Sequence, residues 1–333
     1  PVAAGPGIFF LFRDEELEQR VLSRRQMGMI SFRPILSVPR LPSNFASGTS
    51  WRQEALDSVR DDLVELLLTM GRVPHADEMP VDLRTRLAGG RLSIKAAMAA
   101  ALATIPSEEM AATAARRADE IGRFFALGAF SGRAPYRRLS PELQRDIRAF
   151  FGSLAAAEGA GRRMLFDAGD AEALAKDAQS HAMAGLGHLS GDKYQVHARD
   201  LPRLTSRLRT YISIAQTLAG TLDNTTIYRV HLASRKLTAL VYPDFDARAL
   251  PRLSDRTKVD LRTGEVTVFD HQTDGRVSVL MEKSRYMAGN EGRYEDQSNF
   301  DSAMRNLFGD CLSTLPFAEV APAMIRAGLR PPY

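Results

Sequence analysis

Arginine side chains gather in one interval of this 333-residue chain, between residues 116 and 148. Four acidic residues lie in the same interval against eight arginines, so its local charge is positive, while the formal net charge of the whole chain is +4. Guanidinium groups make forked hydrogen bonds to phosphate oxygens. The interval predicts contact with nucleic-acid phosphates, with an ordinary solvated helix surface as the alternative. The residues concerned are Arg116, Arg117, Arg123, Arg133, Tyr136, Arg137, Arg138, Arg145 and Arg148.

A second basic group follows at Arg199, Arg203, Arg207 and Arg209. If a helix begins early enough, the first three share one face, because they are spaced by four residues. We expect Arg203 and Arg207 to contribute to the same phosphate contact, together with Lys283 farther along the chain. Contacts of this kind strengthen association with DNA without reading its sequence.

Carboxylates late in the chain could carry out a different chemistry. Asp260, Glu265 and Asp270, with the pair Glu282 and Lys283, could hold a magnesium ion that activates water for attack on a phosphodiester. This reading predicts a divergent metal-dependent nuclease. The alternative is that Asp260 and Glu265 flank a hairpin, where exposed charges protect the edge of a sheet.

Other metal and cofactor signatures are missing from the sequence. His181, His188 and His197 are seven and nine residues apart, unlike the i, i+4 pairs that bind metals on helices. No glycine-rich turn joins a strand to a helix and no Walker lysine motif occurs, so we predict no metal and no cofactor in this chain. The single cysteine, Cys311, is expected to be a small buried hydrophobe.

The composition predicts a globular protein of one large or two ordinary domains, since 44% of the residues are hydrophobic. No segment approaches the roughly 20 apolar residues of a membrane span, and the start lacks the layout of a signal peptide. One cysteine fits a reducing compartment. We therefore expect a cytoplasmic protein with no membrane partner.

Helices are expected to dominate the first half of the chain. Apolar residues recur at helical spacing from Leu56 to Met70, and Gly71 is placed to end that helix. Ser140 followed by Pro141 predicts a helix start, because serine caps the helix and proline fits its first position. Further helices are expected near residues 81–87, 92–105, 107–129, 171–183 and 201–219.

Between Thr226 and Met287 the pattern changes to four apolar stretches of strand length. The tetrapeptide RTGE at residues 262–265 predicts a tight hairpin between two of them. The segment YPDFD, here called the PDFD motif, comprises Tyr242, Pro243, Asp244, Phe245 and Asp246. We expect its acids to fix a turn through side-chain to backbone hydrogen bonds rather than to catalyse.

The predicted fold class is α+β, with a mainly helical N-terminal domain followed by a small antiparallel β-sheet module and flanking helices. We divide the chain into residues 1–50 (strand, helix and extended connector), 51–184 (helical domain) and 185–333 (α+β module). The apolar run GIFFLF at residues 7–12 needs a sheet to join. Two placements fit it: the last strand of a preceding domain, or a strand paired with the later β region.

Several stretches resemble one known family. They are RDEELEQRVLSRR, LSPELQRDIRAFFGS, KYQVHARDLPRL, and VYPDFD followed by KVDLRTGEVTVFD. They resemble the non-catalytic regions of the DNA phosphorothioation-associated methyltransferase family. There, a strand like GIFFLF closes a Rossmann domain, so the resemblance implies an S-adenosylmethionine-dependent methyltransferase domain before Pro1, with no methyl-transfer motif in this chain.

The family pattern is incomplete here. The family follows its PDFD motif with a Pro-His pair, where this chain reads ARALPRL, and of a His-Arg-Lys-Glu string this chain keeps only Lys283. The resemblance therefore implies recognition: a DNA-associated region of a bacterial defence or modification system that positions DNA, phosphorothioate-bearing DNA included, for a partner catalytic domain. A protein-interaction scaffold of such a system is the alternative, beside the nuclease. No residue is assigned to catalysis.

Overall fold

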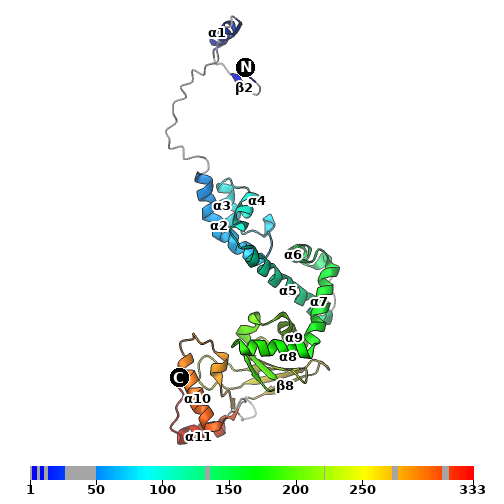
Figure 1. Cartoon of the computed structure of the whole chain (residues 1–333), viewed down its shortest axis with the longest axis vertical. Coiled ribbons are helices and arrows are strands. Elements are labelled where there is room, and N and C mark those ends of the chain that lie inside the picture. The colour runs from blue at the N-terminus through cyan, green and yellow to red at the C-terminus, as the bar shows by residue number, and fades with distance from the viewer. Residues whose placement is uncertain are drawn as a thin grey trace.

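The computed structural model of the protein describes residues 2–5, 8–10, 14–26, 50–131, 136–220, 222–271, 277–309 and 315–333. Helices occupy most of the chain before residue 184, and an antiparallel sheet with further helices follows (Figure 1). This architecture confirms the predicted α+β class. Among the described helices, none combines the length and the apolar character needed to cross a lipid bilayer.

The first described elements form a small hairpin and a helix. Strand β1 (Val2–Gly5) pairs antiparallel with β2 (Ile8–Phe10), and α1 (Glu15–Gln26) follows. The strand predicted in GIFFLF therefore exists, but its placement against the later β region is wrong, because its described partner is β1. The extended connector expected up to residue 50 lies, apart from its last residue, outside the described residues.

A first helical cluster is built on α2 (Ser50–Met70), with η1 (Ala76–Glu78), α3 (Val81–Gly89) and α4 (Ile94–Leu102). The helical spacing of apolar residues in α2 buries one face of that helix against α3 and α4. Helix α2 ends as predicted, because Gly71 adopts a φ of +66°, which ordinary side chains disfavour. The residues buried in this cluster include Val59, Leu63, Leu67, Leu83, Leu87 and Met98.

The next helices are α5 (Ser107–Ser131), the short η2 (Tyr136–Arg138), α6 (Pro141–Phe151), α7 (Leu154–Gly169) and α8 (Ala171–Met183). The predicted start of α6 is confirmed: the Ser140 hydroxyl accepts a hydrogen bond of 3.2 Å from the backbone N–H of Leu143. Helices α5 and α7 cross at close range, because Gly161 presents no side chain to the backbone of Ala126.

The main sheet has six strands in the order β3-β4-β5-β6-β7-β8, and all of its pairs are antiparallel. The first three strand-length stretches predicted between Thr226 and Met287 and the hairpin at Gly264, with a φ of +74°, are confirmed. In the described part of the fourth stretch, only Ser278 and Val279 form a strand, and it lies outside this sheet. The first two strands of the sheet were not predicted, because they are short and lie beside a glycine-rich tract. The strands are β3 (His188–Ser190), β4 (Lys193–His197), β5 (Ile227–His231), β6 (Lys236–Val241), β7 (Asp255–Asp260) and β8 (Val266–Asp270).

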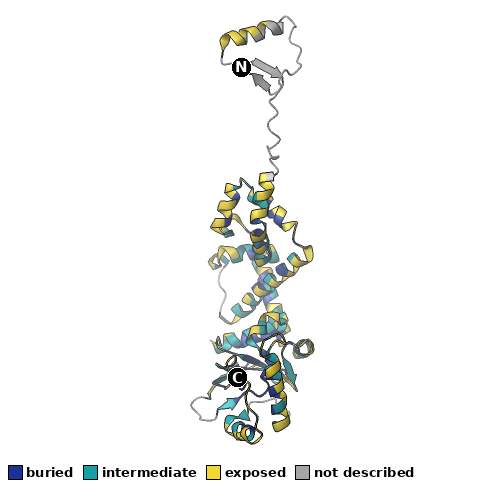
Figure 2. Ribbon diagram, turned by 90° about the vertical axis from the view of Figure 1, so that its left-hand side faces the viewer, coloured by how far each residue is buried: buried dark blue, intermediate teal, exposed yellow. Residues whose placement is uncertain are grey.

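Between β4 and β5 the chain forms η3 (Ala198–Arg203) and α9 (Ser206–Ala219). The expectation that Arg199, Arg203 and Arg207 share one helical face is wrong, because extended backbone at residues 204 and 205 separates the two helices. Helices α8 and α9 pack on the sheet, and Figure 2 shows the buried residues gathered between them and the strands. This hydrophobic cluster contains residues from both sides of the predicted domain limit between residues 184 and 185. That limit stays a prediction.

The last part of the chain forms a smaller unit beside the sheet (Figure 1). Its hydrophobic cluster joins the loop after β6 to α10 and α11, with Val279, Phe300, Met304 and Val320 at its centre. Lys283 lies in the short helix η4 of this unit. The elements are β9 (Ser278–Val279), η4 (Lys283–Tyr286), α10 (Tyr294–Phe308), β10 (Leu315–Pro316) and α11 (Phe317–Arg326), with β9 and β10 paired antiparallel.

The crossing of α5 and α7 predicts opposite effects for two glycines of α7. A Cβ at Gly161 would lie 2.7 Å from the backbone nitrogen of Ala126, whereas a Cβ at Gly159 meets only the mobile end of Arg163, at 3.7 Å. Gly161→Ala should lower the free energy of unfolding by ~1–3 kcal/mol through overpacking. Gly159→Ala should raise it by ~0.5–1 kcal/mol through helix propensity. Urea unfolding curves of the two variants check both signs, and stabilisation by Gly161→Ala would contradict the close crossing.

Candidate nucleic-acid interface

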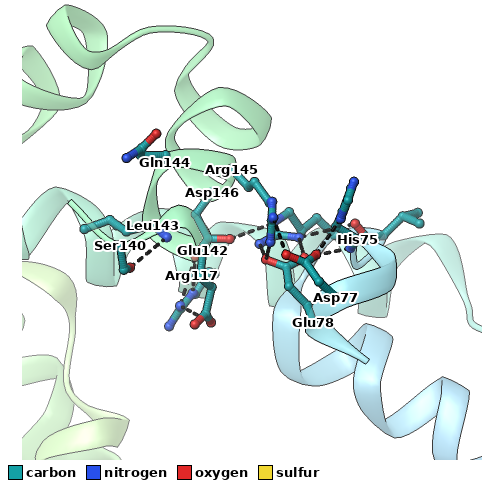
Figure 3. Close-up of polar contacts among 12 residues, drawn as sticks. His75, Asp77, Glu78, Arg117, Ser140, Glu142, Leu143, Gln144, Arg145 and Asp146 are labelled. Carbon is teal, nitrogen blue, oxygen red and sulfur yellow. Dashed lines mark hydrogen bonds and ion pairs between the residues drawn. The ribbon is translucent and has the colours of Figure 1, made fainter. Parts of the chain in front are cut away.

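A buried carboxylate holds α6 in place. The Asp146 side chain is 1% exposed, and its Oδ1 accepts a hydrogen bond of 2.6 Å from Arg72 Nε, just beyond α2. Its Oδ2 accepts a hydrogen bond of 3.0 Å from Arg117 Nε on α5. Figure 3 shows Asp146 and Arg117 facing each other across the gap between α6 and α5. Two guanidiniums, one just beyond α2 and one on α5, thus compensate one buried charge on α6.

A second acidic group extends this network toward η1. Arg72 donates to both carboxylate oxygens of Glu78, at 2.8 and 2.7 Å. Arg145 on α6 lies 2.6 Å from Asp77 and 3.0 Å from Glu78 (Figure 3). The hydrogen bonds from Arg72 lower the pKa of Glu78 to about 2, and those from Arg145 and His75 lower the pKa of Asp77 to about 2. The acids are therefore fully ionised in the folded protein at neutral pH.

Several arginines predicted to bind phosphate are engaged inside the protein. Arg117 and Arg145 belong to the network around Asp146, with side chains 34% and 28% exposed. Arg123 pairs with Asp119 at 2.8 Å on α5, and Arg116 donates to the hydroxyl of Thr113. The ring hydroxyl of Tyr136 donates to the carbonyl oxygen of Gln144 at 3.2 Å. Each of these side chains therefore already has a protein partner.

The second basic group is paired in the same way. Arg203 lies 3.1 Å from Asp200 in η3, and Arg207 lies 2.7 Å from Asp177 on α8. Arg207 also donates to the carbonyl oxygen of Asp167. These contacts tie α9 to α7 and α8, so the structure gives Arg207 a positioning role within the helical layer.

Three of the predicted arginines stay available to a ligand. Within the described residues, the side chains of Arg137, Arg138 and Arg148 are exposed and make no hydrogen bond or ion pair. Arg137 and Arg138 lie in η2, directly before α6, and Arg148 lies in its last turn. Arg133 lies outside the described residues. The arginines exposed for phosphate binding are thus fewer than the sequence interval predicted. They lie on α6 and directly before it.

The PDFD motif closes the loop that follows β6. Asp244 Oδ1 accepts a hydrogen bond of 2.9 Å from the backbone N–H of Arg252, which is the kind of contact expected for this acid. Asp244 also pairs with Arg248 at 2.9 Å. Asp246 is exposed at the surface of the loop, and its backbone carbonyl accepts a hydrogen bond from Arg293. Asp244 therefore holds the loop in shape.

Lys283 is buried and does not face solvent. Its side chain donates 3.0 and 3.2 Å hydrogen bonds to the Arg248 carbonyl and the Tyr333 hydroxyl. The ammonium also lies 4.9 Å from the ring centres of Phe245 and Tyr333. Burial lowers the pKa of Lys283 from its usual range, while Asp246 opposes that shift. A cation held between two rings positions them. Lys283 therefore links the PDFD motif to Tyr333.

Two acids of the nuclease alternative are paired with basic residues. Asp260 pairs with Lys236 at 2.9 Å, and Glu282 binds Arg285 and Arg305 in the C-terminal unit. Among the described residues, no group of three or more histidine, cysteine, aspartate or glutamate side chains is placed to hold a metal ion. His197 packs 4.8 Å from the ring of Phe245, and burial lowers its pKa to about 4.

Sequence reasoning missed Arg72, Asp77 and Glu78, which complete the network around Asp146. No local signal marks them, because Arg72 and Asp146 are 74 positions apart in the chain. Comparisons with protein-family models, curated proteins and solved structures gave no match to this chain.

The lowered pKa of Glu78 predicts acid sensitivity. Its carboxyl has a pKa of about 2 in the folded protein, whereas an unfolded chain has the ordinary glutamate value of about 4.3. The unfolded state then binds more protons, so this contribution to stability is present above pH ~4.3 and is lost as the pH falls toward 2. Glu78→Gln should be less stable than wild type at pH 7 and should lose less stability on acidification.

Thermal midpoints measured from pH 7 to pH 2 check this expectation. Glu172→Gln, which removes the same charge from an exposed position at the start of α8, serves as the control. Identical pH profiles for Glu78→Gln and wild type would contradict the role of the Arg72 contact.

Two buried tyrosines, one of them in the PDFD motif, are expected to differ in how loss of the hydroxyl changes stability. The hydroxyl of Tyr242 is buried without a hydrogen-bond partner among the described residues, whereas that of Tyr194 donates to the Leu186 carbonyl at 2.7 Å. Tyr242→Phe should leave the free energy of unfolding unchanged or raise it by up to ~1 kcal/mol, because an unpaired buried hydroxyl is unfavourable. Tyr194→Phe should lower it by ~1–2 kcal/mol. Denaturant titration measures both, and a larger loss for Tyr242→Phe would show that its hydroxyl has a partner.

Proposed function

We propose that this chain is a DNA-associated recognition region of a DNA-modification protein, of the kind implied by its resemblance to the DNA phosphorothioation-associated methyltransferase family. Its part is to bind the DNA backbone and position it, phosphorothioate-bearing DNA included, for a partner methyltransferase domain that uses S-adenosylmethionine. Modification and defence systems of bacteria are the setting that the resemblance implies.

The exposed cations on α6 and in η2 directly before it carry this proposal. Arg137, Arg138 and Arg148 lie at the surface without a partner among the described residues, so phosphate binding would break no internal ion pair. A rise of ~1.5 Å per residue puts Arg148 about 10 Å along α6 from Pro141, so the cations at its two ends can meet different phosphates. Each guanidinium offers a fork of donors that matches phosphate oxygens.

The rigidity of α6 favours the same function. Asp146 and Arg145 attach this helix to η1, to α5 and to Arg72 just beyond α2, through ion pairs that are partly or fully buried. A helix held in this way presents its exposed cations in one fixed arrangement, which reduces the entropy lost on binding. Contacts of this kind position DNA but do not read its bases.

Exposed aromatic side chains favour a second candidate, a scaffold that docks another protein. Phe166 on α7 is 81% exposed, and Phe124 and Phe130 on α5 are each 49% exposed. Aromatic residues are enriched where proteins meet. These exposed rings offer apolar contacts to a modification-system protein, with or without DNA on α6.

A charge-reversal variant tests the DNA proposal. Arg137→Glu, Arg138→Glu and Arg148→Glu combined should weaken binding of a 20-base-pair duplex at least tenfold at 100 mM salt. The slope of log K against log salt concentration should fall in magnitude by about 3, since each lost phosphate contact removes roughly 0.9. Fluorescence anisotropy across 50–300 mM salt measures both quantities.

The matched control reverses three exposed arginines elsewhere: Arg84→Glu, Arg262→Glu and Arg326→Glu. It changes the net charge by the same amount, so a general electrostatic effect would weaken both variants equally. Equal weakening, or absence of duplex binding by the wild-type protein at 50 mM salt, would reject the proposal and leave protein docking as the better reading.

A further inference from the structure

A cavity of 310 Å³ opens between the loop after the PDFD motif and helix α11. Its size is at the lower end of the ~300–1,000 Å³ that small-molecule sites occupy. The loop contributes Arg248, Ala249, Leu250 and Arg252, and the rest of the lining comes from α11 and the residues that follow it. None of the residues assigned to the α6 surface lines this cavity.

The charged residues in the lining are all arginines. They are Arg248, Arg252 and Arg330, and no carboxylate lines the cavity in the described part of the chain. Asp244 of the PDFD motif organises two of them, because one of its oxygens pairs with Arg248 and the other accepts the backbone N–H of Arg252. Arg252 also lies 5.1 Å over the ring of Phe317. Asp244 thus balances the charge of Arg248, while Arg252 and Arg330 have no carboxylate partner among the described residues.

The floor and walls are apolar. Ala249, Leu250 and Met324 are almost fully buried beneath the cavity, and the rings of Phe317 and Tyr333 stand at its sides. The Tyr333 ring is held firmly: its hydroxyl donates to Gln297 and accepts from Lys283, and Arg293 lies 4.6 Å over its ring centre. An apolar or aromatic group can enter here without leaving a buried polar atom unpaired.

We propose that this cavity binds a nucleoside phosphate, with the base against the apolar walls and the phosphate on the arginines. An inorganic anion would leave the apolar floor in contact with water, and an uncharged apolar molecule would leave Arg252 and Arg330 without an anionic partner among the described residues. A nucleoside phosphate satisfies both parts, because aromatic rings and guanidinium planes stack on bases while guanidinium forks bind phosphate. This inference goes beyond the proposed DNA contact on α6 and does not depend on it.

Binding of 2′-deoxyadenosine monophosphate (dAMP) to the full chain tests the proposal. Isothermal titration or ligand-observed NMR should detect dAMP binding below millimolar concentration, with deoxyadenosine and inorganic phosphate each at least tenfold weaker. Arg252→Glu combined with Arg330→Glu should weaken dAMP binding at least tenfold. Ala321→Phe, which fills the cavity from α11, should abolish it without changing the α6 surface.

The control is Arg262→Glu combined with Arg326→Glu, which changes the charge equally at exposed positions outside the cavity, Arg326 lying on the same helix. No dAMP binding at 5 mM, equal binding of dAMP and phosphate, or equal weakening by the control would overturn the proposal. A single-stranded oligonucleotide that competes with dAMP would identify the strand as the source of the nucleotide, and lack of competition would identify the free nucleotide; either result supports the shared chemistry. Duplex binding by the α6 surface is read separately, so the two proposals can fail independently.

Discussion

Asp146 carries a negative charge in surroundings that exclude almost all solvent. The two arginines that balance this charge come from other parts of the helical half of the protein. A buried carboxylate without a partner is strongly unfavourable, and removal of one partner from a buried pair typically costs ~3–5 kcal/mol. Helix α6 can therefore lie only where Arg72 and Arg117 both reach Asp146. The direction of the exposed arginines on and before α6 follows from this one constraint.

The C-terminal unit depends on a comparable arrangement of charge at the PDFD motif. Asp244 accepts a hydrogen bond across the loop that follows β6. The Lys283 ammonium lies against the rings of both Phe245 and Tyr333. The Asp244 contact is local, whereas the Lys283 contacts join segments far apart in the chain, and both lie beside an arginine-rimmed cavity. The motif thus acts on its neighbours through position, which agrees with a role in recognition.

Local patterns predicted much of this fold. The apolar spacing before Gly71, the Ser140 cap and the hairpin at Gly264 each depend on residues within a few positions of one another, and each is confirmed. The same reasoning missed β3 and β4, since strands this short beside glycines lack a clear pattern. It also placed Arg199, Arg203 and Arg207 on one helix, because it did not recognise the extended break before α9.

The sequence by itself determined the type of the long helices and of the strands from β5 to β8, the α+β class and the excess of arginine around α6, because helix periodicity, capping and composition are properties of neighbouring residues. Only the tertiary structure decided which arginines have partners. Arg117 and Arg145 looked equivalent to Arg137 and Arg148 along the chain, yet the first two bind acids of the protein and the last two do not within the described residues. The reason is physical: an ion pair requires closeness in space, and folding brings Arg72 to Asp146 across 74 positions that no local pattern connects.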